Sequence, residues 1–495
     1  MELKNFTPRE YQKKILETSK NKNTLVVLPT GLGKTACAIM LAVDRLNRYT
    51  NSKVLICSPT KPLCSQHVES FKEYTNVNEN EIILLTGATQ PSKRKELWKN
   101  KKIIIATPQT IESDLENKRF SLKDFSMLCI DEAHRSKEKF ANTIVAKNYM
   151  ENSLSPRILA LTASPGSTKE KINEIRKNLF IEAIEIRTVQ DEDVKQYVKE
   201  KEINWVEVEL PIDIKNISEK LKSLYKSKLT ELSKFGLNKP VNYINKRDLL
   251  QLQVQLQKEI QKGNKYAYHA VSTVATIIKL NHCIELLETQ GISQFKGYIL
   301  KLRNETSKAA KNLLKERYII EALSDLDKIN IEHPKLERLY HEVENHLKEN
   351  ESIRIMVFAN YRNTVKEIMS ALKKLPNARP IELVGQKEGL TQKEQIERIK
   401  EFGSGKYNIL IGTSISEEGI HIANADHAIF YEPTPSEIRD IQRRGRVGRL
   451  TKGKIIILIT KDTRDVAYYW TARKKEQKMK NILNKMQNDS LNRNY

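Results

Sequence analysis

The sequence of 495 residues has few cysteines and no long apolar run. Its five cysteines are odd in number and form no CxxC pair, so we expect neither a zinc site nor a disulfide framework. No apolar stretch approaches the roughly 18 residues of a membrane span, and the first nine residues lack the apolar core of a signal peptide. We therefore expect a cytoplasmic protein without membrane contact.

Length and charge indicate the number of domains and the kind of binding partner. A chain of this length suggests two to four domains, and 39% apolar with 30% charged residues is typical of globular proteins. The net charge of +23 favours a polyanionic partner. Lysine enrichment through genomic base composition is the alternative, which the many Asn, Lys and Ile residues also fit. Charge alone does not decide between the two.

The order of apolar runs predicts an α/β fold. Short β-branched runs alternate with helical stretches in two parts of the chain, which is typical of parallel sheets covered by helices. The segment between them is rich in Lys, Leu, Gln and Glu and is predicted to be helical. The second α/β part is predicted to begin at His333-Pro334. The polar tail 486–495 is expected to fray. The predicted strands are residues 24–28, 53–57, 81–85, 103–106, 127–130, 158–161, 354–358, 381–384, 408–412, 427–431 and 454–459. The predicted parts are an ATP-binding domain (1–197), a helical insert (198–333) and a second α/β domain (334–495).

A phosphate-binding loop follows the first predicted strand. The run from Leu28 to Thr35 reads Leu-Pro-Thr-Gly-Leu-Gly-Lys-Thr and precedes a predicted helix, so its backbone N–H groups can cradle a phosphate. Lys34 would reach the β- and γ-phosphates of ATP, and the Thr35 hydroxyl would hold Mg²⁺. Leu28 stands where the general motif has its first glycine. The loop residues expected to bind nucleotide are Thr30, Gly31, Gly33, Lys34 and Thr35.

Two adjacent carboxylates end another predicted strand. Asp131 is expected to hold Mg²⁺ and Glu132 to accept a proton from the attacking water, because ligands collect at the carboxyl ends of parallel strands. Helix capping is the alternative for such a pair in isolation. His134 has no partner at metal-ligand spacing, so a linking role between the nucleotide and the second domain is predicted for it.

A run late in the chain completes the predicted catalytic set. Residues 442–449 read Gln-Arg-Arg-Gly-Arg-Val-Gly-Arg, and Arg446 and Arg449 would share one helix face. Arginines directed at a γ-phosphate contribute about 10³ to 10⁵ in rate; a helix that binds phosphate backbone is the alternative. We assign Gln442, Arg446 and Arg449 to catalysis. Because the motifs lie more than 400 residues apart, two parts of the fold must close on one ATP, which couples hydrolysis to motion.

These runs and several lesser ones resemble superfamily 2 helicases, which have two RecA-like domains. The resemblance implies that Arg9 and Gln12 read the adenine, that Thr162 and Ser164 join His134 in coupling the two sites, and that Glu418 and Gly419 contact the nucleotide. It also implies contacts to the nucleic-acid backbone at Pro59, Thr60, Lys61, Thr86, Gly87, Thr107, Pro108, Thr110, Thr413 and Ser414.

More narrowly, the chain is similar to the archaeal Hef and Fanconi anaemia group M family. Residues 430–439, which read Phe-Tyr-Glu-Pro-Thr-Pro-Ser-Glu-Ile-Arg, and residues 463–470 carry this likeness. It implies a DNA helicase or translocase that remodels forks and junctions in repair, a thumb-like insert, and other repair proteins as partners. The family dimerises through a C-terminal part that this sequence lacks, so a monomer is expected.

Two departures from the family pattern stand out. His421 occupies the motif V position where the family usually has Asp, which affects nucleotide affinity or interdomain coupling. The ERKxxxD nuclease signature and the helix-hairpin-helix module of full-length relatives do not occur in this sequence, so no nuclease activity is predicted.

The insert is predicted to bind DNA. Its basic residues alternate with Tyr225, Tyr243 and Tyr266, a pattern that suits phosphate binding with base stacking; an ordinary solvated face is the alternative. Two other functions stay open: a duplex-RNA-stimulated ATPase like RIG-I and Dicer helicases, and an ATP-gated clamp that moves no strand. The basic residues are Lys220, Lys222, Lys226, Lys228, Lys246, Arg247, Lys262 and Lys265.

Overall fold

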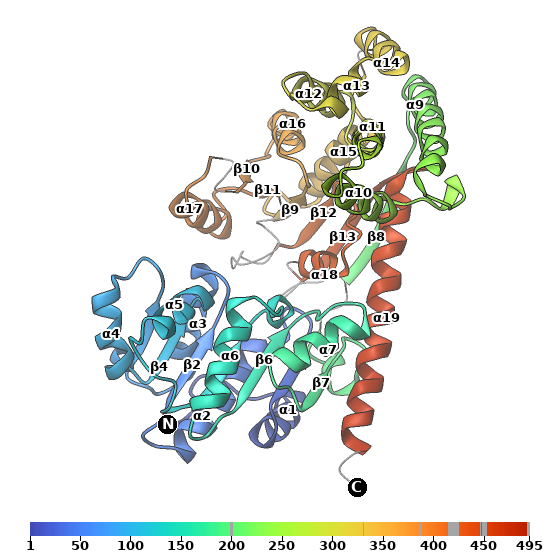
Figure 1. Cartoon of the computed structure of the whole chain (residues 1–495). Coiled ribbons are helices and arrows are strands. Elements are labelled where there is room, and N and C mark those ends of the chain that lie inside the picture. Colours follow the sequence, from blue (N-terminus) through green and yellow to red (C-terminus); the bar gives the residue numbers. More distant parts are fainter. Residues whose placement is uncertain are drawn as a thin grey trace.

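Two parallel sheets and a helical bundle make up the molecule (Figure 1). The computed structural model describes residues 1–198, 201–329, 331–385, 389–413, 425–445, 447 and 453–492. Within these residues the predicted architecture of two α/β domains and a helical part is confirmed.

The first sheet has seven parallel strands whose sides are covered by helices. Its strands are buried β-branched runs, and parallel pairing requires a crossover segment between successive strands. The strands, in spatial order, are β3 (Ile82–Leu85), β4 (Ile103–Ala106), β2 (Lys53–Cys57), β5 (Phe125–Ile130), β6 (Ile158–Thr162), β1 (Thr24–Val27) and β7 (Ala183–Ile186). The helices are α1 (Glu10–Asn21), α2 (Lys34–Arg48), α3 (Lys61–Tyr74), α4 (Pro91–Asn100), α5 (Pro108–Glu116), α6 (Ala141–Asn152), α7 (Lys169–Asn178) and α8 (Glu192–Lys195).

The second sheet has six parallel strands, and β8 forms one of its edges. In spatial order these are β10 (Pro380–Leu383), β11 (Ile409–Gly412), β9 (Ile355–Phe358), β12 (His427–Phe430), β13 (Gly453–Thr460) and β8 (Lys201–Val208). Its helices are α15 (Pro334–Glu349), α16 (Arg362–Leu372), α17 (Gln392–Gly403), α18 (Glu437–Arg444) and α19 (Arg464–Asn492).

The position of β8 differs from the sequence prediction. We assigned residues 198–333 to a helical insert, whereas residues 201–208 pair with β13 along its whole length. Four of the eight side chains in β8 are charged or amide residues, because an edge strand is buried on fewer sides than a central one. Its sequence therefore lacks the continuous apolar run of the other strands. The chain therefore enters the second sheet once before it builds the bundle.

The helical bundle stands on the second domain. It consists of α9 (Ile212–Glu231), α10 (Lys246–Gln261), α11 (Tyr266–Thr289), α12 (Ile292–Arg303), α13 (Lys308–Leu314) and α14 (Arg317–Asp327). Helix α11 runs through its centre, and it is the one helix in the described part of the chain that is long and apolar enough to cross a membrane. Its most apolar 18-residue window has a mean hydropathy of 1.3, and 61% of that window is buried among the neighbouring helices.

Helix α19 joins all three parts of the molecule. Its first turns contact the bundle, where Arg464 Nη1 lies 3.2 Å from Glu285 Oε2 and the Tyr468 hydroxyl donates to Glu285 Oε1. Its last turns lie beside β7, and Met479, Leu483 and Met486 are buried in the core of the first domain. The tail was predicted to fray from residue 486; instead the helix continues to residue 492, because its apolar side chains have a core to enter.

Candidate nucleotide site

The phosphate loop lies between β1 and α2, as the sequence predicts. Gly31 and Gly33 have φ of 91° and 74°, values that a residue with a β-carbon adopts only with strain. Gly33 caps α2, so the N–H groups at the start of this helix face the loop. The Lys34 ammonium crosses the loop and donates to the Leu28 carbonyl at 3.1 Å. Thr35 is the second residue of the helix.

Helix α1 packs against the same loop. The Tyr11 hydroxyl donates to the Leu32 carbonyl at 2.8 Å, and a β-carbon at Gly33 would lie 2.5 Å from Gln12 Nε2. The Arg9 guanidinium lies over the ring of Tyr197, 4.8 Å from its centroid. The structure thus places Arg9 and Gln12 at the edge of the loop. Tyr11 and Tyr197 were missed by the sequence analysis, although Tyr11 is flanked by the motif residues.

Asp131 is held by a histidine that the sequence analysis did not single out. His67 of α3, buried to 3% exposure, places its Nε2 3.0 Å from Asp131 Oδ2, and Ser58 donates to the same oxygen at 3.4 Å. Burial alone would raise the pKa of Asp131. The hydrogen bond and charge of His67, with the Lys34 ammonium, outweigh burial and hold that pKa below its ordinary value. Asp131 is therefore a charged carboxylate at neutral pH.

Glu132 and His134 form a short polar chain with the end of β6. Glu132 has a φ of 52°, a strained conformation for a residue with a side chain, and such strain concentrates at functional sites. His134 Nδ1 lies 3.3 Å from Glu132 Oε2 and 3.3 Å from Thr162 Oγ1. The three groups predicted for proton transfer and coupling therefore touch one another within the first domain.

This series of polar contacts continues from Thr162 to the C-terminal helix α19. The Ser164 N–H donates to Thr162 Oγ1 at 3.1 Å, and the Ser164 hydroxyl lies 3.0 Å from Met479 Sδ of α19. The predicted coupling residues His134, Thr162 and Ser164 thus connect Glu132 to a helix that starts in the other half of the molecule.

The second domain meets the phosphate loop at the end of α18. A β-carbon at Gly445 would lie 2.4 Å from Thr30 Cβ and 2.7 Å from Thr30 Oγ1, so the Gly445 backbone is in close contact with the Thr30 side chain. Gln442, one turn earlier, is 5% exposed, and its Oε1 atom has no hydrogen-bond partner among the residues that the structure describes. Five predicted site residues lie outside the described residues: Ser414, Glu418, Gly419, Arg446 and Arg449.

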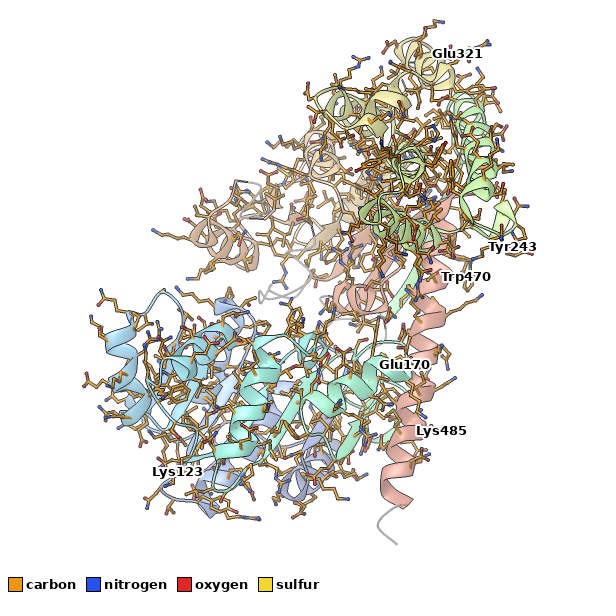
Figure 2. The ribbon with its side chains drawn as sticks, viewed as in Figure 1. Lys123, Glu170, Tyr243, Glu321, Trp470 and Lys485 are labelled. Atoms are coloured by element: carbon orange, nitrogen blue, oxygen red, sulfur yellow. The ribbon has the colours of Figure 1, made fainter. Side chains whose placement is uncertain are left out.

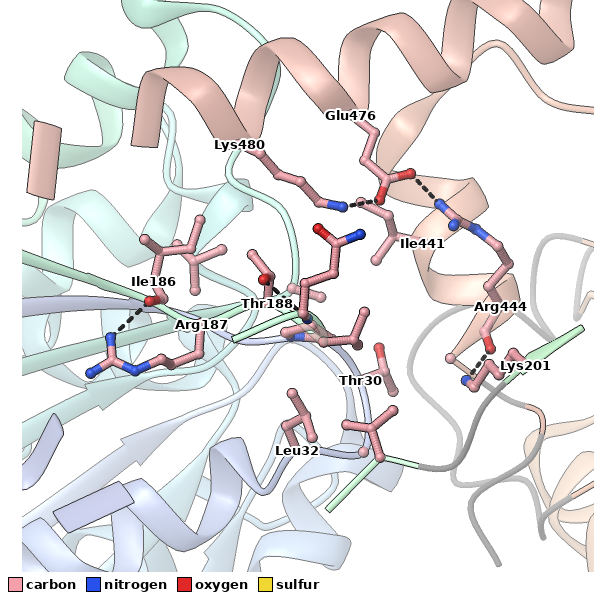
Figure 3. A pocket seen from close by; sticks show the side chains of 18 of the residues that line it. Thr30, Leu32, Ile186, Arg187, Thr188, Lys201, Ile441, Arg444, Glu476 and Lys480 are labelled. Carbon is pink, nitrogen blue, oxygen red and sulfur yellow. Dashed lines mark hydrogen bonds and ion pairs between the residues drawn. The ribbon is translucent and has the colours of Figure 1, made fainter. Parts of the chain in front are cut away.

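A cavity of about 770 Å³ separates the domains beside this contact (Figure 3). Arg9, Thr30, Gly31 and Tyr197 line it from one side, and residues of α18, α19 and β8 line it from the other. The second-domain wall is tied together by polar contacts. Lys201 Nζ donates to the Arg444 carbonyl at 2.7 Å, Arg444 pairs with Asp440 at 2.8 Å, and Arg444 also pairs with Glu476. Arg444 and Lys480 hold the pKa of Glu476 at about 2 against the opposing effect of burial.

The residues present fit a nucleoside triphosphate with a divalent cation. Two left-handed glycines at a helix start form the phosphate cradle after β1, and the charged carboxylate of Asp131 lies at the carboxyl end of β5, with β6 between the two strands. In the described part of the chain, neither buried oxygen, Glu132 Oε2 or Gln442 Oε1, makes a hydrogen bond, and Glu132 Oε2 has only the 3.3 Å contact with His134. Both oxygens are therefore available to a water or a phosphate-bound group. Thr35 and Asp131 are the two side chains that would hold the cation.

The predicted nucleic-acid residues lie at the carboxyl ends of β2, β3, β4 and β11. Lys61 and Gly87 are exposed there, and Pro59, Thr60 and Thr107 are half-buried. Thr86, Pro108, Thr110 and Thr413 are buried: Thr110 shares a hydrogen bond of 2.9 Å with Thr107, and Thr413 N–H donates to the Leu383 carbonyl at 3.3 Å. The buried threonines therefore shape the loops, while Lys61 and Gly87 form their outer surface.

This fold and this site define a class of protein: a two-domain ATPase of the helicase type. The model of the DEAD/DEAH box helicase matches residues 9–172, and that of the helicase conserved C-terminal domain matches residues 334–451. A helical-bundle model described for an ATP-dependent RNA helicase matches residues 213–333, which begins within α9. That start supports a bundle that excludes β8.

Individual relatives are closely similar. The crystal structure of the Pyrococcus furiosus Hef helicase domain shares 42% sequence identity at a TM-score of 0.72, covering 94% of this chain and 98% of that one. A Methanocaldococcus jannaschii protein described as an ATP-dependent RNA helicase is 41% identical over 98% of this chain and 61% of its own length. The ATP-dependent DNA helicase mph1 of Neurospora crassa is 34% identical over 92% of this chain and 41% of its own length. This chain belongs to the Hef family of helicases, and it spans less than two thirds of these two longer relatives.

Proposed function

We propose that this chain is an ATP-dependent DNA helicase or translocase that acts on branched DNA at replication forks. The observation that carries the proposal is the close contact of Gly445 with Thr30 beside a cavity that both domains line. A nucleotide on the phosphate loop would then lie close to Gly445 at the end of α18. Closure on ATP and opening after hydrolysis would move one domain relative to the other.

The side chains divide the chemistry between them. Lys34 and the loop N–H groups bind the phosphates, and Glu132 orients the attacking water and accepts its proton. Mg²⁺ held by Thr35 and Asp131 would supply charge neutralisation at the phosphates. Gln442, Arg446 and Arg449 of the second domain stabilise the charge of the transition state. Hydrolysis then requires both domains, and the contact from Ser164 to Met479 gives the first domain a link to α19.

Support for a DNA substrate comes from the surface and the relatives. Lys61 and Gly87 give the first domain an exposed, sequence-independent surface for a sugar–phosphate backbone. The N. crassa relative is named a DNA helicase.

The insert would supply a smaller contact than its sequence suggests. Lys222 lies 2.5 Å from Glu288 and Lys228 lies 2.9 Å from Glu316, so these charges are compensated internally. Tyr225 packs into the apolar core of the bundle. The basic residues that are exposed and remain available to contact DNA are Lys226, Lys246, Arg247 and Lys265. Two exposed tyrosines accompany them, Tyr243 at 71% and Tyr266 at 86% exposure. Lys220 and Lys262 also have acidic partners.

Steady-state ATPase assays on a panel of nucleic acids test the proposal. We expect stimulation by single-stranded DNA and stronger stimulation by forks and four-way junctions. Lys34→Ala and Glu132→Gln should abolish turnover while DNA binding persists, with the exposed Lys348→Ala as a control variant. Turnover that survives in either site variant would reject the site. A streptavidin-displacement assay separates translocation from an ATP-gated clamp, since a clamp would displace nothing.

A second candidate is a duplex-RNA-stimulated ATPase. The names of the M. jannaschii relative and of the helical-bundle model, which both specify RNA helicases, favour it. Duplex RNA in the same ATPase panel decides between the two. Stimulation by RNA that exceeds stimulation by forked DNA would make RNA the substrate and would overturn the DNA proposal.

A further inference from the structure

Helix α19 has basic side chains of two kinds. One group has partners inside the protein: Arg464 pairs with Glu285, Lys480 pairs with Glu476 at 2.9 Å, and Lys475 donates to the Pro435 carbonyl at 2.9 Å. The other group consists of Lys474, Lys478 and Lys485, which are exposed and make no ion pair within 4 Å in the described part of the chain.

The three uncompensated lysines share one face of the helix. They follow each other at spacings of four and seven residues, and Trp470, 47% exposed, precedes them on the same face at a spacing of four (Figure 2). Gln477 and Asn481 lie between them, and the one carboxylate that α19 adds to this face in the described residues, Asp489, follows Lys485 by four residues at the far end. From Trp470 to Lys485 the face is about 22 Å long. The lysines and amides line a shallow hollow of about 500 Å³.

An acidic group of the neighbouring helix α7, Glu170, lies within electrostatic range of Lys478. Hydrogen bonds from its own backbone N–H and from Thr168 lower the pKa of Glu170, which is fully exposed (Figure 2), and the charge of Lys478 lowers that pKa further. Lys169 of the same helix also lowers this pKa. Two lysines therefore act on one carboxylate, and the surface keeps an excess of positive charge.

The α19 face lies far from the loops that are predicted to bind the tracked strand. Helix α19 lies beside β7, one edge of the first sheet, whereas the loops predicted to hold the tracked strand follow β2, β4 and β3 toward the opposite edge. Seven strands place the two edges about 29 Å apart. The α19 face thus lies at the sheet edge away from the β2–β4 loops, and we assign a polyanion on this face to a different arm of the substrate.

We propose that the Trp470–Lys485 face of α19 binds the sugar–phosphate backbone of a second duplex arm of branched DNA. The inference rests on the proposed DNA helicase function and supplies a structural source for its preference for branches. The lysines pair with phosphates, Gln477 and Asn481 donate to phosphate oxygens, and the Trp470 ring packs against the sugar edge. Such contacts carry no base specificity.

The test compares two triple variants of the full chain. Lys474→Gln/Lys478→Gln/Lys485→Gln removes the charge of the face. Lys366→Gln/Lys373→Gln/Lys374→Gln removes the same charge from exposed lysines around α16, which also make no ion pair within 4 Å in the described residues. Fluorescence anisotropy without nucleotide measures the affinity for a fork and for a single strand at several salt concentrations. Three lost phosphate contacts should lower the salt slope for the fork by about 2.7 and its affinity by roughly tenfold or more at low salt.

The outcomes separate this inference from the proposed function. In the α19 variant, single-strand binding and single-strand-stimulated ATPase should equal those of the α16 variant, and acetylation of Lys474 and Lys485 in the unmodified chain should be blocked by the fork alone. An unchanged fork affinity and salt slope would overturn the proposal, as would an equal loss for fork and single strand. If no DNA stimulates ATPase in the unmodified chain, the proposed function fails, while anisotropy still reports on the α19 face.

Discussion

Gly445 of the second domain and Thr30 of the phosphate loop touch backbone to side chain, so closely that the space between them has no room for a methyl group. The glycine is the last point that the structure describes before Arg446. Its lack of a side chain allows the end of α18 to approach the phosphate loop this closely.

Gly445→Ala should therefore impair hydrolysis. The added methyl group would overlap Thr30 and force the domains apart or strain the loop, at a cost of about 1–3 kcal/mol. This cost corresponds to a loss of roughly 5- to 150-fold in kcat/KM. ATPase kinetics measure the loss. Gly297→Ala is the matched control, because its new β-carbon meets only Asn363 at 3.7 Å. Equal ATPase activity of both variants would show that the close contact of Gly445 with Thr30 is unimportant for hydrolysis.

His67→Leu should weaken the binding of magnesium nucleotide. The change removes the hydrogen bond that holds Asp131 and leaves that buried carboxylate short of a partner. We expect a rise of roughly tenfold in the Kd for a fluorescent ADP in the presence of Mg²⁺, with little change in its absence. His67→Gln keeps a donor near the same place and should restore most of the affinity. A loss of equal size with and without Mg²⁺ would mean that His67 serves folding alone.

Leu483→Ala should destabilise the chain by about 2–5 kcal/mol. The leucine is fully buried in the core of the first domain, although it belongs to a helix that begins at the bundle. Urea unfolding measures the free energy. Asn484→Ala, at the next and exposed position, should change it by less than about 0.5 kcal/mol. A value for Leu483→Ala as small as the control would show that α19 does not dock in solution.

His333 should make the fold sensitive to acid. Burial and the charge of Lys335 lower its pKa to about 3, and its neutral ring donates to the Glu288 carbonyl at 3.0 Å and accepts from the Lys335 N–H at 3.2 Å. In the unfolded chain the ring titrates near its ordinary pKa of about 6.5. Below that pH the unfolded state takes up a proton that the folded state refuses, so the free energy of unfolding falls with decreasing pH.

The contribution of His333 to the pH dependence of unfolding can be isolated with the variant His333→Asn. Asparagine does not titrate, and its side chain can still cap the N-terminus of α15. Stability of the unmodified chain should fall by about 1 kcal/mol more than that of the variant between pH 6.5 and 5.5, since a full pKa unit corresponds to about 1.4 kcal/mol. Urea unfolding at the two pH values gives both slopes. Parallel slopes would contradict the assignment, because all other titrating groups are common to the two proteins.

The local parts of the site could be predicted from the sequence because short-range rules govern them. A buried strand, two glycines and a helix start specify the phosphate loop, and a strand that ends in Asp131 and Glu132 places both carboxylates at the same edge of the sheet. His67 could not be found this way. It lies on a helix with ordinary polar neighbours, and only the packing of α3 on the sheet brings it to Asp131.

By itself the sequence determined the alternation of strands and helices, the loop that binds phosphate, and the family to which the chain belongs, because periodicity and motifs are written within a few residues. The tertiary structure decided that β8 joins the second sheet, that α19 ends in the core of the first domain, and that Gly445 meets Thr30. These contacts join residues hundreds of positions apart. Their partners are chosen by the shape and charge of assembled surfaces, which local sequence patterns do not encode.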